Sequence, residues 1–222
     1  YYHYENDLVN LELSGLNWYG SPVISGSSQP ILTNISNAKE NVDGFIELKI
    51  KGHSTNGSLN TFHSVEMHIN EPNSNKIGNT ISWSGNGTRK ISATISSQNL
   101  NRFENTFFIN NISSDNNSSP YLDYLAFKYG RELIFSEQSL EFFSPIKNEN
   151  VRFNFNSTLP SNILALDITN PGQPKTIEVI DNQNIEVTLE DQNIGRFILV
   201  DRSYIKTIDE INHENGISFN FL

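Results

Sequence analysis

Residues Tyr121–Phe135 read YLDYLAFKYGRELIF, the longest nearly unbroken apolar and aromatic run in the chain. At a period of two residues, one face carries Asp123, Leu125 and Phe127 and the other carries Leu122 and Ala126. Both faces are mostly apolar, which predicts a central strand that is covered on both sides. A strand of these 15 residues would extend roughly 50 Å, far beyond the usual strand length. We therefore expect a bend or a break at Gly130.

A helix over the same run is the alternative, because the run is poor in β-branched residues. Its aromatic density and its neighbourhood favour the strand. The chain is rich in Asn, Ser, Ile and Phe, and stretches of strand-favouring residues alternate with turns of Asn, Gly and Ser. This composition is typical of an all-β protein.

Regular alternation predicts further strands at Phe45–Lys51, Phe62–Ile69 and Arg89–Ile95, and the turn SGNGT at 84–88 predicts a hairpin. Beyond the polar stretch KNEN at 147–150, five short strands follow within about fifty residues. We therefore predict a jelly-roll-like β-sandwich over residues 1–144 and a small Ig-like β-sandwich over residues 145–222. The closing ISFNFL, Ile217–Leu222, alternates as a last strand.

Composition excludes several function classes. The 222 residues include no cysteine, which excludes disulfides, thiolate metal sites and a cysteine nucleophile within them. The net charge of −10 argues against a nucleic-acid partner, because no basic stripe is available to neutralise phosphates. No apolar run is long enough for a membrane span. Because the chain starts at Tyr1 without a Met or a signal peptide, we interpret it as an excised piece or a processed product.

Aromatic side chains are the first candidates for ligand binding. Trp18, Tyr19 and Trp83 are flanked by turn residues, so they either form an exposed platform on which a sugar stacks or fold back to cap the core. Capping is the more common outcome. No serine-elbow, zinc-helix, dinucleotide or phosphate-loop motif accompanies them.

Charged side chains supply two weaker candidates. Asp123 lies in an apolar strand, so it either forms a buried ion pair with Arg131 or Lys128, or faces solvent at the start of the strand. The polar loop 113–120 carries oxygen ligands at 115–117 (Asp115, Asn116 and Asn117) that suit a structural calcium ion, although their spacing is not that of an EF-hand. A solvated loop is the simpler interpretation, and no other cofactor is expected.

Three segments resemble gingipain-like cysteine peptidases of the PorU type, the sortase of the type IX secretion system. They are YLDYLAFKYGREL at 121–133, GLNWYG at 15–20 and ALDITNPGQPKTIEV at 165–179. The third is the most specific, with Asp167–Pro171 matching the family's pattern and Leu166 standing where the family often has Trp. There Asp167, Asn170 and Pro171 are expected to act locally, the first two by accepting hydrogen bonds from turn amides.

The resemblance implies a non-catalytic β-sandwich region that precedes the peptidase domain. It implies export to the outer-membrane surface or the extracellular space. It also implies as partners the downstream peptidase domain, secreted cargo or secretion-system proteins. The family's catalytic His and Cys lie in the later domain, so none is assigned to this sequence. Two alternatives stay open: a carbohydrate-binding jelly-roll module of a secreted bacterial protein, and an adhesin-like structural module.

Overall fold

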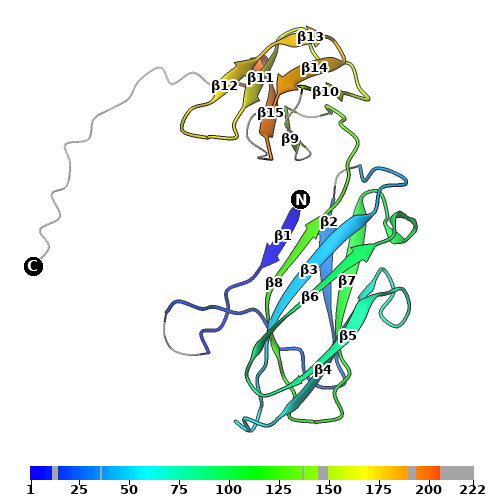
Figure 1. Cartoon of the computed structure of the whole chain (residues 1–222), viewed down its shortest axis with the longest axis vertical. Coiled ribbons are helices and arrows are strands. Elements are labelled where there is room, and N and C mark those ends of the chain that lie inside the picture. The colour runs from blue at the N-terminus through cyan, green and yellow to red at the C-terminus, as the bar shows by residue number, and fades with distance from the viewer. Residues whose placement is uncertain (12–14, 36, 137, 145–149, 190–193, 206–222) are drawn as a thin grey trace, which may run out of the picture. The chain divides into compact units, whose positions relative to one another are not determined.

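The computed structural model describes residues 1–11, 15–35, 37–136, 138–144, 150–189 and 194–205. Its regular elements in these ranges are β-strands and two short 3-10 turns, Ser97–Asn99 and Arg202–Tyr204 (Figure 1). The all-β prediction is therefore confirmed, and the helical alternative for the run at 121 is wrong. The chain divides into two compact units, unit 1 (Tyr1–Glu132) and unit 2 (Leu133–Leu222).

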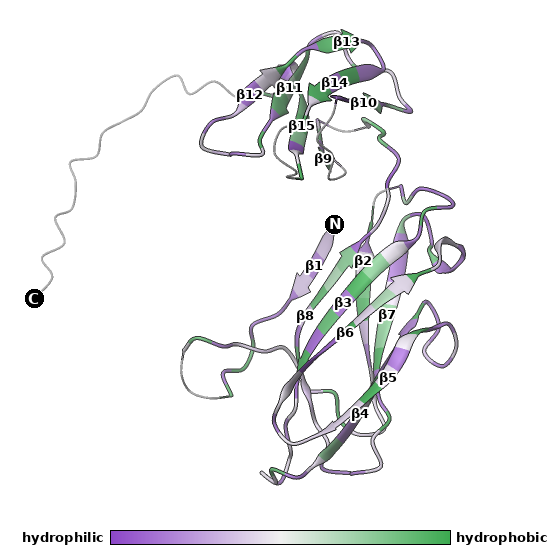
Figure 2. Ribbon diagram, in the orientation of Figure 1, coloured by the Kyte–Doolittle hydropathy of each residue, from purple (hydrophilic) through white to green (hydrophobic). Residues whose placement is uncertain are grey.

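Unit 1 is a sandwich of two antiparallel sheets, each with four strands. Sheet I has the order β1-β8-β3-β6, with β1 at Tyr2–Glu5, β8 at Tyr121–Lys128, β3 at Gly44–Lys51 and β6 at Thr88–Ile95. Sheet II has the order β2-β7-β4-β5, with β2 at Ser28–Asn34, β7 at Glu104–Asn111, β4 at Phe62–Ile69 and β5 at Lys76–Ser84. Hydrophobic residues are visible along β3, β7 and β8 (Figure 2).

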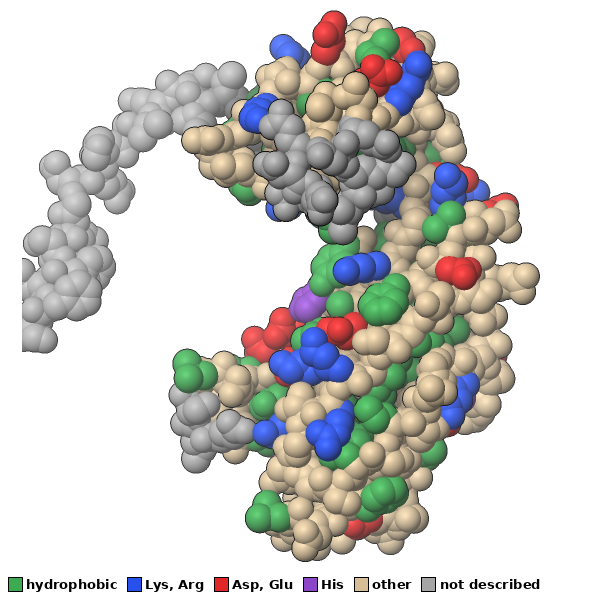
Figure 3. Space-filling model, viewed as in Figure 1, with side chains coloured by type: hydrophobic (Ala, Val, Ile, Leu, Met, Phe, Trp, Pro, Cys, Tyr) green, Lys and Arg blue, Asp and Glu red, His purple; other side chains and the backbone are tan. Residues whose placement is uncertain are grey.

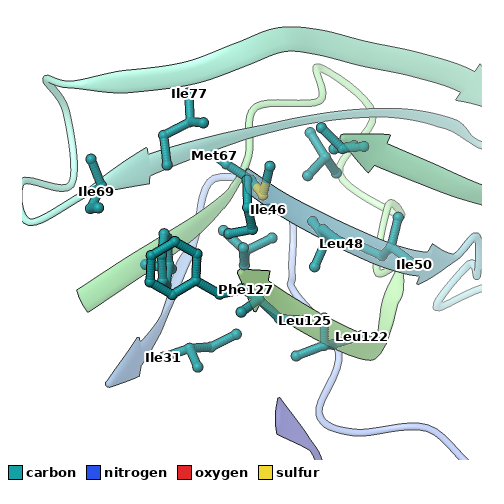
Figure 4. Packing of buried hydrophobic residues seen from close by; sticks show 14 of the residues in the cluster. Ile31, Ile46, Leu48, Ile50, Met67, Ile69, Ile77, Leu122, Leu125 and Phe127 are labelled. Carbon is teal, nitrogen blue, oxygen red and sulfur yellow. The ribbon is translucent and has the colours of Figure 1, made fainter. Parts of the chain in front are cut away.

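The core of unit 1 fills the space between these sheets. Alternate residues of the strands point inward, as their period of two requires, and they include Ile46, Leu48, Ile50, Met67, Ile69, Leu122, Leu125 and Phe127 (Figure 4). The rings of Phe107 and Phe127 meet edge to face across the two sheets, with centroids 5.2 Å apart. Such contacts add to the free energy gained from burying the rings.

Strand β8 is interrupted twice relative to the prediction. It ends at Lys128, so the chain leaves the sheet before Gly130, where an added Cβ would lie 2.7 Å from a methyl carbon of Val42. It also contains a bulge that was not predicted: Lys49 lies opposite Tyr124 and Ile50 opposite Leu122, so Asp123 is an extra residue. The bulge turns both Asp123 and Tyr124 outward, and the predicted shared face of Asp123 and Leu125 is wrong.

Two strands of unit 1 gave no signal in the sequence. Strand β1 lies in the polar aromatic stretch YYHYEND, and β2 contains Pro30. Pro30 is tolerated because β2 is an edge strand. The alternating stretch at 8–13 forms only a single bridge, between Val9 and Tyr19, and residues 12–14 lie outside the described part of the chain.

Unit 2 is a smaller antiparallel sandwich. One sheet has the order β10-β14-β13 (Asn150–Asn154, Asn184–Thr188, Val179–Asp181). The other has the order β12-β11-β15-β9 (Lys175–Ile177, Ile163–Asp167, Arg196–Asp201, Ser139–Phe143). Its core contains buried aliphatic side chains and four aromatic rings that contact one another: Phe142, Phe153, Phe155 and Phe197.

The boundary expected after Ser144 therefore lies too late in the chain. Strand β9 precedes that boundary and yet pairs along its length with β15, so it belongs to unit 2. Polarity of the stretch at 147–150 suggested the later boundary, and residues 145–149 lie outside the described part of the chain. The predicted strand at Ile217–Leu222 also lies outside it.

The fully buried ring of Phe127 tests the unit 1 core. We expect Phe127→Ala to lower the free energy of unfolding by about 3–5 kcal/mol, because it leaves a cavity against Phe107. Phe103→Ala is the matched control, since that ring is 60% exposed and should change stability by no more than about 0.5 kcal/mol. Urea unfolding followed by fluorescence measures both. Equal losses for the two variants would contradict this packing.

Candidate functional site

The predicted aromatic platform does not form. Trp18 is 44% exposed and its indole N–H donates to the Gly15 carbonyl oxygen at 3.3 Å, but Tyr19 and Trp83 are each only 5% exposed. Tyr19 pairs with Val9, and Trp83 packs in the core of unit 1. The expectation that these three rings bind a ligand together is therefore wrong, and the capping alternative holds for two of them.

Trp83 is buried against a histidine on the neighbouring strand. His63 of β4 lies directly opposite it, and the ring centroids are 4.9 Å apart. Nδ1 of His63 lies 2.8 Å from the Ser118 hydroxyl oxygen. Burial lowers the pKa of His63, because desolvation disfavours the charged ring.

The Ser118–His63 contact resembles a nucleophile–base pair in composition and distance, and sequence analysis did not find it. Both side chains are fully buried, and the Ser118 hydroxyl also interacts with the Asn111 side chain. A substrate has no access to such a pair, so we interpret the contact as part of a polar core network.

Because of His63, we expect the free energy of unfolding to fall as the pH is lowered. The folded pKa is depressed, so the full contribution is present above the unfolded value of about 6.5 and is lost as the pH falls through the folded pKa. We expect the free energy of unfolding to drop between about pH 7.5 and 5.5, and to drop less in His63→Gln. Urea titrations at both values measure this, with His3→Gln as the exposed control. An unchanged slope in His63→Gln would contradict the assignment.

The bulge gives Asp123 a partner that the sequence analysis did not consider. Its carboxylate lies 2.9 Å from Nζ of Lys49 on β3, and the Asp123 side chain is 13% exposed. Lys49 has its pKa raised, chiefly by this contact. The predicted pairing with Arg131 or Lys128 is wrong, because Arg131 lies beyond the end of β8, where it bridges to Ala38.

Tyr124 organises a second set of charges on the same outer face of sheet I. Its hydroxyl donates a hydrogen bond to Glu47, and Nζ of Lys90 lies 2.9 Å from the same carboxylate oxygen. These two contacts hold the pKa of Glu47 below its ordinary value. Nζ of Lys49 and Nζ of Lys90 lie 5.6 and 5.8 Å from the Tyr124 ring centroid, within cation–π range.

A pit opens above Ala126 on this face. Directly opposite Ala126 lie His3 on β1 and Glu47 on β3, so a small residue stands between two larger ones. The pit has a volume of about 350 Å³ and is lined by Tyr1, His3, Phe45, Glu47, Tyr124, Ala126 and Lys128. On this side of unit 1, basic and acidic side chains lie among apolar ones (Figure 3). We take this pit as the candidate site.

A second hollow, of about 470 Å³, lies in unit 2 beside the turn after β11. Asp167 and Asn170 line it, and each accepts a backbone N–H, from Thr169 at 2.8 Å and from Gly172 at 3.1 Å. These are the turn hydrogen bonds expected from the sequence, with Pro171 inside the turn. The residues that line this hollow include no aromatic side chain, and Oδ1 of Asp167 and Oδ1 of Asn170 already accept backbone N–H groups.

In the loop at 113–120, the Asp115 carboxylate accepts hydrogen bonds from backbone N–H groups. Asp115 accepts N–H groups from Phe62 at 3.1 Å and from Asn117 at 3.0 Å, and the bond from Asn117 is the main cause of its lowered pKa. Its oxygens therefore face donors and offer no preformed calcium cage. Within the described ranges, no three His, Asp or Glu side chains gather as a metal site would require.

Comparison with known proteins finds solved structures of similar fold. No family model and no curated protein matches the chain. Dimeric latent PorU from Porphyromonas gingivalis matches 91% of this chain with a TM-score of 0.73 and 14% sequence identity. This chain has the fold of part of PorU. It spans 20% of the PorU chain, and the match includes both units, since unit 1 holds only residues 1–132 of 222.

Two carbohydrate-binding modules are similar over shorter stretches. CBM36 in complex with calcium and xylotriose matches 58% of this chain and 89% of its own, at 12% identity and a TM-score of 0.37. The CBM36-1 domain of a xylanase from a Trinervitermes trinervoides hindgut metagenome matches 59% and 88%, at 14% identity and a TM-score of 0.34. Both TM-scores fall below that of PorU. No helix in the described residues is long and apolar enough to cross a membrane.

The Asp123–Lys49 pair should contribute measurably to stability. In a double-mutant cycle of Asp123→Asn and Lys49→Met, we expect a coupling of about 0.5–1 kcal/mol, kept small because Lys49 is about a third exposed. The coupling should shrink in high salt. The exposed Arg152–Asp181 pair, 3.6 Å apart, is the control and should give no measurable coupling. Unchanged thermal stability in Asp123→Asn would contradict the paired carboxylate.

Proposed function

We propose that this chain is the non-catalytic β-sandwich region that precedes the peptidase domain of a gingipain-like cysteine peptidase of the PorU type. Its role is to position the catalytic domain or to contact cargo during type IX secretion, at the outer-membrane surface or outside the cell. The observation that carries the proposal is the match of 91% of the chain, with residues from both units, to one part of PorU.

The chemistry of the chain supports a non-catalytic role. It holds no cysteine, so the thiol of a cysteine peptidase has to lie elsewhere in the polypeptide. The closest approach to a catalytic pair, Ser118 with His63, is sealed inside unit 1. The charges on sheet I are mostly paired with one another, which suits a stable surface better than proton transfer.

The stand-alone carbohydrate module is the weaker candidate in its original form. It needed a sheet face with Trp18, Tyr19, Trp83 or Tyr124 exposed. Tyr19 and Trp83 are buried, and Lys49 and Lys90 lie over the Tyr124 ring. An exposed Trp18 alone does not make a platform.

The native polypeptide decides between these functions. We expect the protein isolated from its source to be longer than this chain and to hydrolyse peptides, with hydrolysis abolished by a thiol-alkylating reagent. Residues 1–222 alone should show no hydrolysis, because they lack a thiol. Mass spectrometry with peptidase assays before and after alkylation measures both. A native protein without a thiol-dependent activity, or hydrolysis by residues 1–222, would contradict the proposal.

A further inference from the structure

The outer face of sheet I around the pit above Ala126 carries an excess of positive charge. Seven charged side chains lie on the outer face of sheet I by strand register: Lys49, Lys51, Lys90, Lys128, Glu5, Glu47 and Asp123. Lysines outnumber carboxylates there, although the chain as a whole has a net charge of −10. Asp123 is paired with Lys49 and Glu47 with Lys90.

Lys128 is the cation at the rim of the pit. Among the described residues, no carboxylate lies within salt-bridge distance of its ammonium group, and Glu47 interacts with it only at longer range. Because Lys90 and Tyr124 already hold the Glu47 carboxylate, that group does not neutralise Lys128. A ligand anion beside Lys128 would therefore form a new charge-assisted contact without displacing an existing pair.

Two exposed aromatic side chains line the same pit as Lys128. Phe45 lies directly opposite Lys128 on β3 and is 42% exposed, and Tyr1 is 58% exposed. The ring of Tyr1 stacks on His3, whose ring in turn contacts Tyr124. The negative face of an aromatic ring attracts the weakly positive C–H groups of a sugar ring. Tyr124 itself is covered by two lysines, so it forms a wall of the pit and leaves the stacking to Phe45 and Tyr1.

We propose that this pit binds an acidic sugar unit of a glycan, with the sugar carboxylate on Lys128 and the sugar ring packed against Phe45 and Tyr1. The accessible part of Glu47 is placed to accept hydrogen bonds from the hydroxyl groups, whereas both ring nitrogens of His3 already contact Tyr1 and Glu5. The pit is confined to Tyr1 and the residues of β1, β3 and β8 that surround Ala126. Its volume of about 350 Å³ suits one or two sugar rings. An extended peptide would need a groove along the strands. The proposal does not depend on the peptidase assignment.

Isothermal titration of residues 1–222 tests this site with three acidic probes: trigalacturonate, a hyaluronan tetrasaccharide and 3′-sialyllactose. We expect at least one probe to bind at millimolar concentration or below, and its methyl ester to bind about tenfold more weakly because the ester carries no charge. Lys128→Gln should weaken binding of the acid by a similar factor, and binding should weaken with added salt.

Two further variants locate the site. Ala126→Leu fills the floor of the pit and should abolish binding, and Phe45→Ala, at an exposed position, gives an independent answer if Ala126→Leu does not fold. Lys175→Gln removes an exposed lysine of unit 2 and should leave the affinity unchanged. The proposal would be overturned if no acidic probe binds, or if the acid and its ester bind with equal affinity. Full affinity in both Lys128→Gln and Phe45→Ala would overturn it as well.

Discussion

The bulge at Asp123 is the constraint on which the rest of sheet I depends. Leu122 and Leu125 are three residues apart, so a strand of strict period two would send them to opposite faces. Both are buried in the core of unit 1, which is possible only because Asp123 is an extra residue opposite the Lys49–Ile50 step. The same insertion turns Asp123 and Tyr124 outward together. Asp123 and Tyr124 are thereby placed to contact Lys49, Glu47 and Lys90, and Tyr124 also forms one wall of the pit.

Much of the fold could be predicted because regular alternation reports burial directly. The runs that became β3, β4 and β6 show it clearly. The glycine turn at 84–88 does connect β5 to β6, but the predicted hairpin is wrong, because the two strands belong to different sheets and do not pair. Elements without that signal were missed. Strand β1 is polar and aromatic, β2 carries a proline, and β9 was assigned to the wrong unit because a polar stretch is a weaker boundary signal than strand pairing.

The candidate site was harder to predict than the fold. Residue type suggested Trp18, Tyr19 and Trp83, but the face on which a ring lies is set by strand register, and register placed Trp83 beside His63 in the core. Glu47, Lys90 and Tyr124 come from three strands far apart in sequence, so no spacing could unite them. The unusual spacing of Leu122 and Leu125 was the one available signal. The match to part of PorU concerns the fold, and the polar outer face is where a specific role of this chain is to be sought.

Cross-strand nuclear Overhauser effects between β8 and β3 test the bulge most directly. We expect contacts that place Lys49 opposite Tyr124 and Ile50 opposite Leu122, with Asp123 opposite no residue of β3. We also expect contacts from the side chains of both Leu122 and Leu125 to core residues of sheet II. A regular ladder in which Asp123 takes its own partner on β3 and shares a face with Leu125 would contradict the account, and with it the geometry of the outer face.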